Sequence, residues 1–106
     1  MYTILRSALF KRQLLHFVKN YKERAGIKIA SKFLDNLEKS INFIGETPYS
    51  CLIYTDIAEQ EFRKWNVKDF PHSIFFRVNE KTITLEVLYA QKMDIENRIL
   101  SDINHN

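Results

Sequence analysis

The chain has 106 residues, of which 45% are hydrophobic and 13% aromatic, so it can enclose one modest core but not two. Sixteen basic and 13 acidic residues leave a formal charge of +3, which is compatible with an RNA, DNA or acidic-protein partner and selects none of them. The single cysteine, Cys51, excludes an internal disulfide and a cysteine-based metal cluster. We therefore expect one domain over residues 1–106, in a reducing cytoplasm.

The N-terminal residues do not resemble a signal peptide, because charge appears early at Arg6, Lys11 and Arg12. No uncharged apolar run approaches the roughly 20 residues that span a bilayer. The sequence predicts a soluble protein without membrane contact.

A short strand over residues 2–5 and two long helices are predicted for the first half of the chain. Ser7 stands where a helix N-cap would, and Gly26 supplies the stop of the first helix. The second helix is expected to end at Gly45, with Pro48 soon after. Each helix has one apolar stripe, made of Phe10, Leu14, Phe17, Val18 and Tyr21 in the first and Ala30, Phe33, Leu34, Leu37, Ile41 and Ile44 in the second. The two helices are predicted to form an αα-hairpin.

Strand-forming residues dominate the second half of the chain. Residues 61–67, 73–78 and 82–89 are rich in β-branched and aromatic side chains, and the polar break at residues 79–81 predicts a tight turn. A short apolar patch at residues 52–54 is interpreted as a further strand at the sheet edge.

Alternation in the last strand predicts which residues share a face. Ile83, Leu85, Val87 and Tyr89 are expected on one face of the sheet and Leu88 on the other. After it, Asp94 can cap a short C-terminal helix containing Ile95, Ile99 and Ile103. The predicted fold class is α+β: an N-terminal strand, an αα-hairpin packed on a small antiparallel-rich sheet, and a short C-terminal helix.

Most familiar chemical motifs are absent from the sequence. Two glycines, Gly26 and Gly45, cannot build a Gly-rich phosphate loop. The histidines are not at metal-ligand spacing, so neither a metal nor a cofactor is predicted. Cys51 is expected to be partly buried and unreactive, since its neighbour Leu52 is apolar.

A group of basic residues on or beside the predicted sheet could grip phosphate. A metal-free ribonuclease needs a base, an acid and cations for the phosphorane. In that reading His72 would be the base and Lys64 or Lys92 the cation. The alternative is a solvated sheet face, in which Arg77 forms a cross-strand ion pair with Glu61 or Glu86. The full group comprises Arg63, Lys64, Lys68, Arg77 and Lys92, accompanied by Trp65 and His72.

The order and spacing of several segments resemble the RelE/ParE family, the toxins of bacterial type II toxin–antitoxin pairs. These segments are Ser7 with its following helix, Pro48 after the hairpin, Arg63 leading into residues 68–71, residues 74–78, and residues 87–92. The resemblance extends from Tyr2 to about Ile99 and implies a first strand that leads through a helical hairpin into a sheet.

Two activities are implied by this resemblance: RelE-like members cut messenger RNA in the ribosome, and ParE-like members poison DNA gyrase. The sequence departs from the nuclease pattern at Ser73 and Asn66, where basic residues would be expected, and it has no tyrosine after Tyr89. The long helices are similar to the ParE-like branch, which we therefore favour. As a nuclease the chain would use Lys64, His72, Arg77 and Lys92, and in target binding we expect Arg63 and Lys68.

The resemblance also implies partners and a role. We expect a cognate antitoxin, with DNA gyrase or the ribosome and its messenger RNA as the target, and growth inhibition linked to plasmid stabilisation. A member that keeps antitoxin binding without toxicity is an alternative, as is an RNA-binding module that uses Trp65, Phe70 and Tyr89 as stacking surfaces. The sequence does not predict an oligomeric state.

Overall fold

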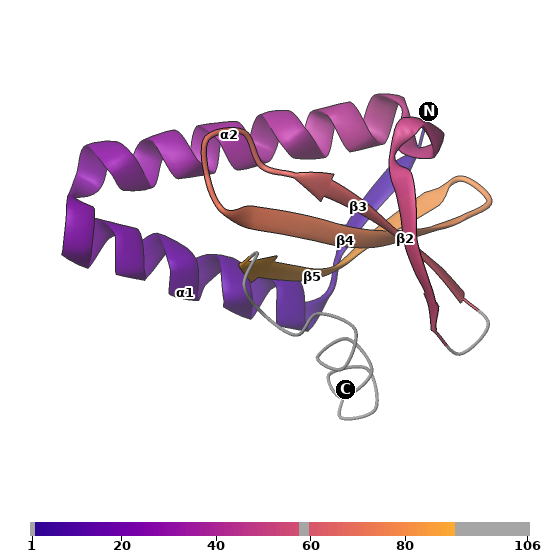
Figure 1. The fold of residues 1–106 in the computed structure, drawn as a ribbon, viewed down its shortest axis with the longest axis horizontal. Helices are drawn as coiled ribbons and strands as arrows, with labels where there is room; N and C mark the ends of the chain where they lie inside the picture. Colours follow the sequence, from indigo (N-terminus) through magenta and orange to yellow (C-terminus); the bar gives the residue numbers. More distant parts are fainter. Residues whose placement is uncertain (1, 58–59, 91–106) are drawn as a thin grey trace.

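The computed structural model describes residues 2–57 and 60–90, in which a helical hairpin packs on a five-stranded sheet. The elements in chain order are β1 (Thr3–Arg6), α1 (Ala8–Ala25), α2 (Ile27–Glu46), a 3₁₀ turn η1 (Pro48–Ser50), β2 (Leu52–Ile57), β3 (Gln60–Asn66), β4 (His72–Asn79) and β5 (Thr82–Ala90). The strand order is β1-β5-β4-β3-β2, with β1 parallel to β5 and the other neighbours antiparallel (Figure 1). The predicted α+β class, the hairpin and the edge strand are confirmed.

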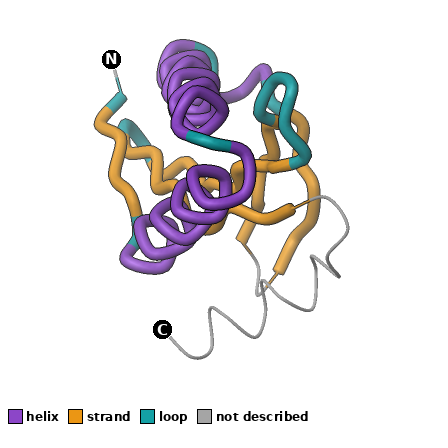
Figure 2. Tube along the Cα trace, turned by 90° about the vertical axis from the view of Figure 1, so that its left-hand side faces the viewer, coloured by secondary structure: helices purple, strands orange, loops and turns teal. Residues whose placement is uncertain are grey.

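Helix α1 begins as its capping residue predicts. The Ser7 hydroxyl accepts a hydrogen bond from the Phe10 N–H at 2.9 Å, which satisfies one of the unpaired donors of the first turn. Gly26 then separates α1 from α2. Its φ of +92° is a backbone conformation that residues other than glycine rarely adopt. The two helices consequently lie side by side (Figure 2).

The predicted end of the second helix is wrong by one residue, because α2 continues through Gly45 to Glu46. Gly45 has a packing role in the last turn. A Cβ at this position would lie 2.7 Å from Cδ1 of Ile4 in β1, which is closer than carbon atoms pack. A larger residue here would require the Ile4 side chain to shift.

The main core lies between the hairpin and one face of the sheet, which we call the hairpin face. Its buried members come from both helices and from β4 and β5, and include Phe10, Leu14, Phe33, Leu37, Ile41, Ile44, Ile74, Phe76, Ile83, Leu85 and Leu88. Burial of these side chains supplies most of the driving force for folding.

The predicted alternation of the last strand is wrong after Leu85, because β5 has a bulge. Phe76 pairs with Leu85 but Phe75 pairs with Val87, so Glu86 has no residue opposite. Val87 and Tyr89 therefore pack with Phe62 and Phe75 on the opposite face of the sheet, which we call the far face.

Helix α1 holds the backbone of this bulge. The Ser7 hydroxyl donates to the Glu86 carbonyl at 2.6 Å, and the Leu88 N–H donates to Oε1 of Gln13 at 2.8 Å. These bonds occupy polar groups that the bulge removes from the strand ladder. The first helix thus fixes where the strand changes face.

Some predictions fall on residues that the structure does not describe. Lys92 and the proposed C-terminal helix with Asp94, Ile95, Ile99 and Ile103 lie outside residues 2–57 and 60–90. Neither described helix has the length and apolar character that a bilayer crossing needs.

Candidate functional site

The sheet separates the candidate site residues onto its two faces. Lys64 follows Phe62 by two positions on the far face, and Arg77 places its guanidinium carbon 5.5 Å from the Phe62 ring centroid on the same face. His72 packs under the hairpin instead. The three described members of the predicted catalytic set are therefore not brought together.

His72 is buried among aromatic rings at the start of β4. Its ring centroid lies 4.3 Å from that of Phe17 and 5.0 Å from that of Phe33. Nε2 and the Tyr21 hydroxyl are 2.9 Å apart, whereas Nδ1 is buried without a hydrogen-bond partner among the described residues. Burial lowers the pKa of His72 to about 4, so the imidazole is neutral at pH 7. Burial also raises the pKa of the Tyr21 phenol.

Arg77 is held by an acidic neighbour in the bulge. Its guanidinium forms an ion pair with Glu86, whose side chain is only 13% exposed. The sequence suggested Glu61 or Glu86 as the partner of Arg77, and the structure selects Glu86. The Oε2 atom of Glu61 lies 3.6 Å from Nη2 of Arg63 instead. Much of the Arg77 charge is therefore compensated within the fold.

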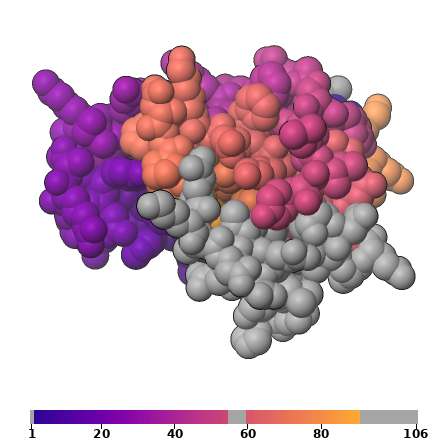
Figure 3. All heavy atoms as spheres, viewed as in Figure 1, coloured from indigo at the N-terminus to yellow at the C-terminus, as the bar shows by residue number. Residues whose placement is uncertain are grey.

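Lys64 lies at an open pocket between β2 and β3. Its Nζ is 5.2 Å from the ring centroid of Tyr54, a cation–π geometry. The pocket has a volume of about 420 Å³ and is lined by Ser50, Leu52, Ile53, Tyr54, Lys64, Trp65 and Asn66. Figure 3 shows the segment that contains β2 at the molecular surface.

Asn66 and Ser73 face each other across β3 and β4 and form a neutral pair. The Ser73 hydroxyl donates to Oδ1 of Asn66 at 2.6 Å. These are the two positions at which the nuclease pattern would carry basic residues. The two positions next to Lys64 therefore carry a neutral hydrogen-bonded pair and add no positive charge.

The two residues expected to bind a target lie in the middle of β3, at Arg63, and in the loop after it, at Lys68. Arg63 donates to the Cys51 carbonyl at 2.8 Å, and its guanidinium carbon is 4.9 Å from the Tyr49 ring centroid. Lys68 is exposed in the loop after β3, where its carbonyl accepts a hydrogen bond from Asn36 at 3.0 Å. Arg63 thus braces the start of β2, and only Lys68 presents an exposed side chain.

Cys51 is buried as the sequence predicts. Burial raises the pKa of its thiol, and the nearby Arg63 opposes that shift only in part. In the part of the chain that the structure describes, no three histidine, cysteine or acidic side chains gather where they could hold a metal ion.

The aromatic residues proposed as an RNA-stacking surface do not form an exposed platform. Trp65 stacks on Phe43 of α2 with ring centroids 4.3 Å apart. Phe70 packs edge-on against Phe33 at 5.1 Å, and Tyr89 is fully buried on the other face. The alternative of an RNA-binding module therefore lacks its stacking surface, because Trp65 and Phe70 pack against the hairpin and Tyr89 lies in the far-face core.

Sequence reasoning missed a run of three exposed apolar side chains as a candidate site. Leu52 is 81% exposed, Ile53 50% and Tyr54 42%, all on β2. The sequence does show three consecutive apolar residues here, without polar residues alternating between them. That pattern was interpreted only as a strand at the sheet edge. Adjacent exposed apolar side chains are more informative than scattered ones.

A parallel N-terminal strand, a helical hairpin and four antiparallel strands define a small protein of the α+β class. A chain of the solved structure titled "Chromosomal ParDE TA system from P. aeruginosa" is similar, with a TM-score of 0.73 and 15% identity. The match covers 85% of this chain and 96% of that chain. No curated protein matches the sequence.

Residues 4–93 match the family described as the ParE toxin of the type II toxin–antitoxin system parDE. The chain belongs to this family. The resemblance inferred from the order of the segments is thereby confirmed.

Proposed function

We propose that this chain is the growth-inhibiting toxin of a type II pair, that it poisons DNA gyrase in the cytoplasm, and that a cognate antitoxin neutralises it. The observation that carries the proposal is the match of residues 4–93 to the ParE toxin of parDE systems. The similarity to a chain of a ParDE system supports an antitoxin partner. The formal charge of +3 suits a partner with an acidic segment.

The geometry of the sheet favours gyrase over messenger RNA as the target. A nuclease needs its base and cations to converge on one phosphate. Here His72 is buried and neutral under the hairpin, whereas Lys64 lies on the other face. The neutral Asn66–Ser73 hydrogen bond occupies positions where further cations would serve a nuclease.

The test is controlled expression in bacteria, with and without the antitoxin encoded beside the toxin gene. We expect growth arrest that the antitoxin relieves, gyrase-dependent DNA breaks, and intact translated messages. Purified chain added to gyrase and supercoiled DNA should raise the amount of cleaved DNA.

Lys64→Ala and Lys92→Ala distinguish the alternative activity, with the exposed Lys19→Ala as the matched control. Message cleavage that disappears in the first two variants and persists in the third would establish a ribosome-dependent nuclease and contradict the proposal. Normal growth with folded chain would leave an inactive family member.

A further inference from the structure

Helix α1 carries an excess of positive charge that its partner in the hairpin does not share. It has five basic residues against one acidic residue, Glu23, an excess larger than the formal +3 of the whole chain. Helix α2 has three lysines, Lys28, Lys32 and Lys39, balanced by three acidic residues. The net charge of the hairpin is therefore located on α1.

Four basic side chains share the face of α1 opposite its buried residues, Phe10 and Leu14. With 3.6 residues per turn, the four fall within a sector of about 100° around the helix. Each is exposed, and none forms an ion pair with a described carboxylate. We call this surface the basic face, and its members are Lys11, Arg12, Lys19 and Lys22.

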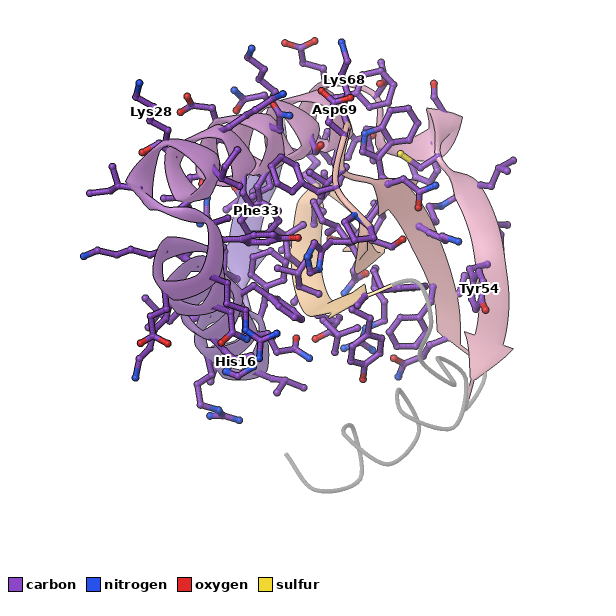
Figure 4. The ribbon with its side chains drawn as sticks, turned by 60° about the vertical axis from the view of Figure 1, so that its left-hand side comes forward. His16, Lys28, Phe33, Tyr54, Lys68 and Asp69 are labelled. Carbon is purple, nitrogen blue, oxygen red and sulfur yellow. The ribbon has the colours of Figure 1, made fainter. Side chains whose placement is uncertain are left out.

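The basic face lies apart from the exposed apolar edge of the sheet. Figure 4 shows His16, one turn after Arg12 on α1, far from Tyr54 on the edge strand. A partner bound to the basic face would therefore leave the apolar side chains of β2 uncovered.

The length of the basic face suits a short stretch of DNA backbone. Lys11 and Lys22 are separated by about three turns, or about 16 Å along the helix axis. One strand of duplex DNA has a phosphate about every 3.4 Å along the duplex axis, so the face spans roughly five phosphates. Lysine and arginine side chains that contact successive phosphates supply affinity without reading the sequence.

Two other acidic partners fit the basic face less well, because it offers little apolar surface. A helix that lies on a membrane buries a broad apolar side in the lipid, but α1 turns its apolar side toward the core and exposes Leu15, at 71%. A protein partner needs an apolar centre in the interface, which one leucine does not supply. Duplex DNA needs neither, since its phosphates carry the interaction.

We propose that the basic face of α1 binds the phosphate backbone of the duplex DNA on which gyrase acts. The inference rests on the proposed function, because gyrase brings duplex DNA to the chain. The contact is independent of base sequence and lets the chain hold enzyme and DNA together.

Fluorescence anisotropy of a labelled DNA duplex, titrated with the full chain at several KCl concentrations, tests the contact directly. Four phosphate contacts predict that the logarithm of the association constant falls with the logarithm of the salt concentration at a slope of roughly −3 to −4. Lys11→Gln/Lys22→Gln should reduce the steepness of this slope by about 2 and raise the Kd at low salt at least about tenfold.

The matched control removes two exposed lysines from other surfaces. Lys39→Gln/Lys81→Gln also lowers the net charge from +3 to +1, and it should raise the Kd for the duplex less than about threefold. An equal loss of duplex binding in the two double variants would show that net charge acts without a defined face, and would overturn the inference. Absence of duplex binding by the unmodified chain would overturn it as well.

The gyrase assay separates this inference from the proposed function. The unmodified chain should raise DNA cleavage by gyrase, and Lys11→Gln/Lys22→Gln should need at least about tenfold more chain for the same cleavage. Equal potency of this variant and the unmodified chain would overturn the inference and leave the proposed function intact. An unmodified chain without effect on gyrase would overturn both.

Vesicles of anionic phospholipid and the full-length antitoxin test the competing occupants of the basic face. We expect Lys11→Gln/Lys22→Gln to weaken binding to the duplex more than binding to either of them. A larger loss for the vesicles or for the antitoxin would assign the basic face to that partner and contradict the inference.

Discussion

His72 has the environment that differs most from its interpretation in the sequence. As a polar residue before an apolar strand it was a candidate base, yet the fold surrounds it with the rings of Phe17, Tyr21 and Phe33. The sequence could not indicate this, because the three rings come from two helices more than 35 residues away. By contrast, the Ser7 cap depends on a neighbour three residues away and was predicted correctly. Cys51 is buried as expected, but by the main core and not by its neighbour Leu52, which is 81% exposed.

Burial of His72 should make stability depend on pH. Its pKa is about 4 in the folded chain and about 6.5 when unfolded, so the unfolded chain takes up the proton first as the pH falls. Its full contribution is present above about pH 6.5 and is lost progressively toward pH 4. We expect the free energy of unfolding in urea to fall by about 2 kcal/mol between pH 8 and pH 5 because of this residue.

The control for this effect removes the histidine together with its hydrogen-bond partner. Tyr21→Phe/His72→Phe should lack the loss between pH 8 and pH 5, whereas Tyr21→Phe alone keeps the histidine and should retain it. A double variant as sensitive to pH as the unmodified chain would show that other groups are responsible.

Among the elements, β5 shows where local patterns stop being informative. Apolar residues at every second position of β5 predicted a uniform face, but the Glu86 bulge moves Val87 and Tyr89 to the far face and Leu88 to the main core. Register is set by pairing with β4 and by the bonds from α1, neither of which has a local sequence signal.

The contact between β1 and α2 yields a test of packing. Gly45→Ala should gain helix propensity but overpack Ile4, so its effect on stability should be near zero or unfavourable. Ile4→Val removes the Cδ1 atom, and in that background Gly45→Ala should stabilise by roughly 0.5–1 kcal/mol. A double-mutant cycle in chemical denaturation measures the coupling; a value of zero would mean that Ile4 moves aside freely.

For the molecule as a whole, positive charge is concentrated on helix α1 of the hairpin. Helix α1 carries five basic residues, Lys11, Arg12, Lys19, Lys22 and Arg24, against the single acidic Glu23. All five are exposed, and none forms an ion pair with a described residue. This surface should attract acidic partners over a distance that salt shortens.

The rate of antitoxin association should therefore fall several-fold as salt rises from about 50 to 500 mM, with less change in dissociation. Stopped-flow mixing measures both. Lys11→Gln/Lys19→Gln lowers the net charge from +3 to +1 and should slow association at low salt while leaving the melting temperature nearly unchanged. An association rate that does not respond to salt would exclude electrostatic steering.

The sequence by itself determined the helices, the turns between them, the strands and the family, because caps, glycine stops and apolar periodicity act between residues close in the chain. Only the tertiary structure decided that His72 is buried, that β5 changes face at Glu86, and that Lys64 lies beside an exposed apolar edge. Each of these depends on pairing or packing between segments distant in sequence, where the energy comes from surfaces that meet only after folding.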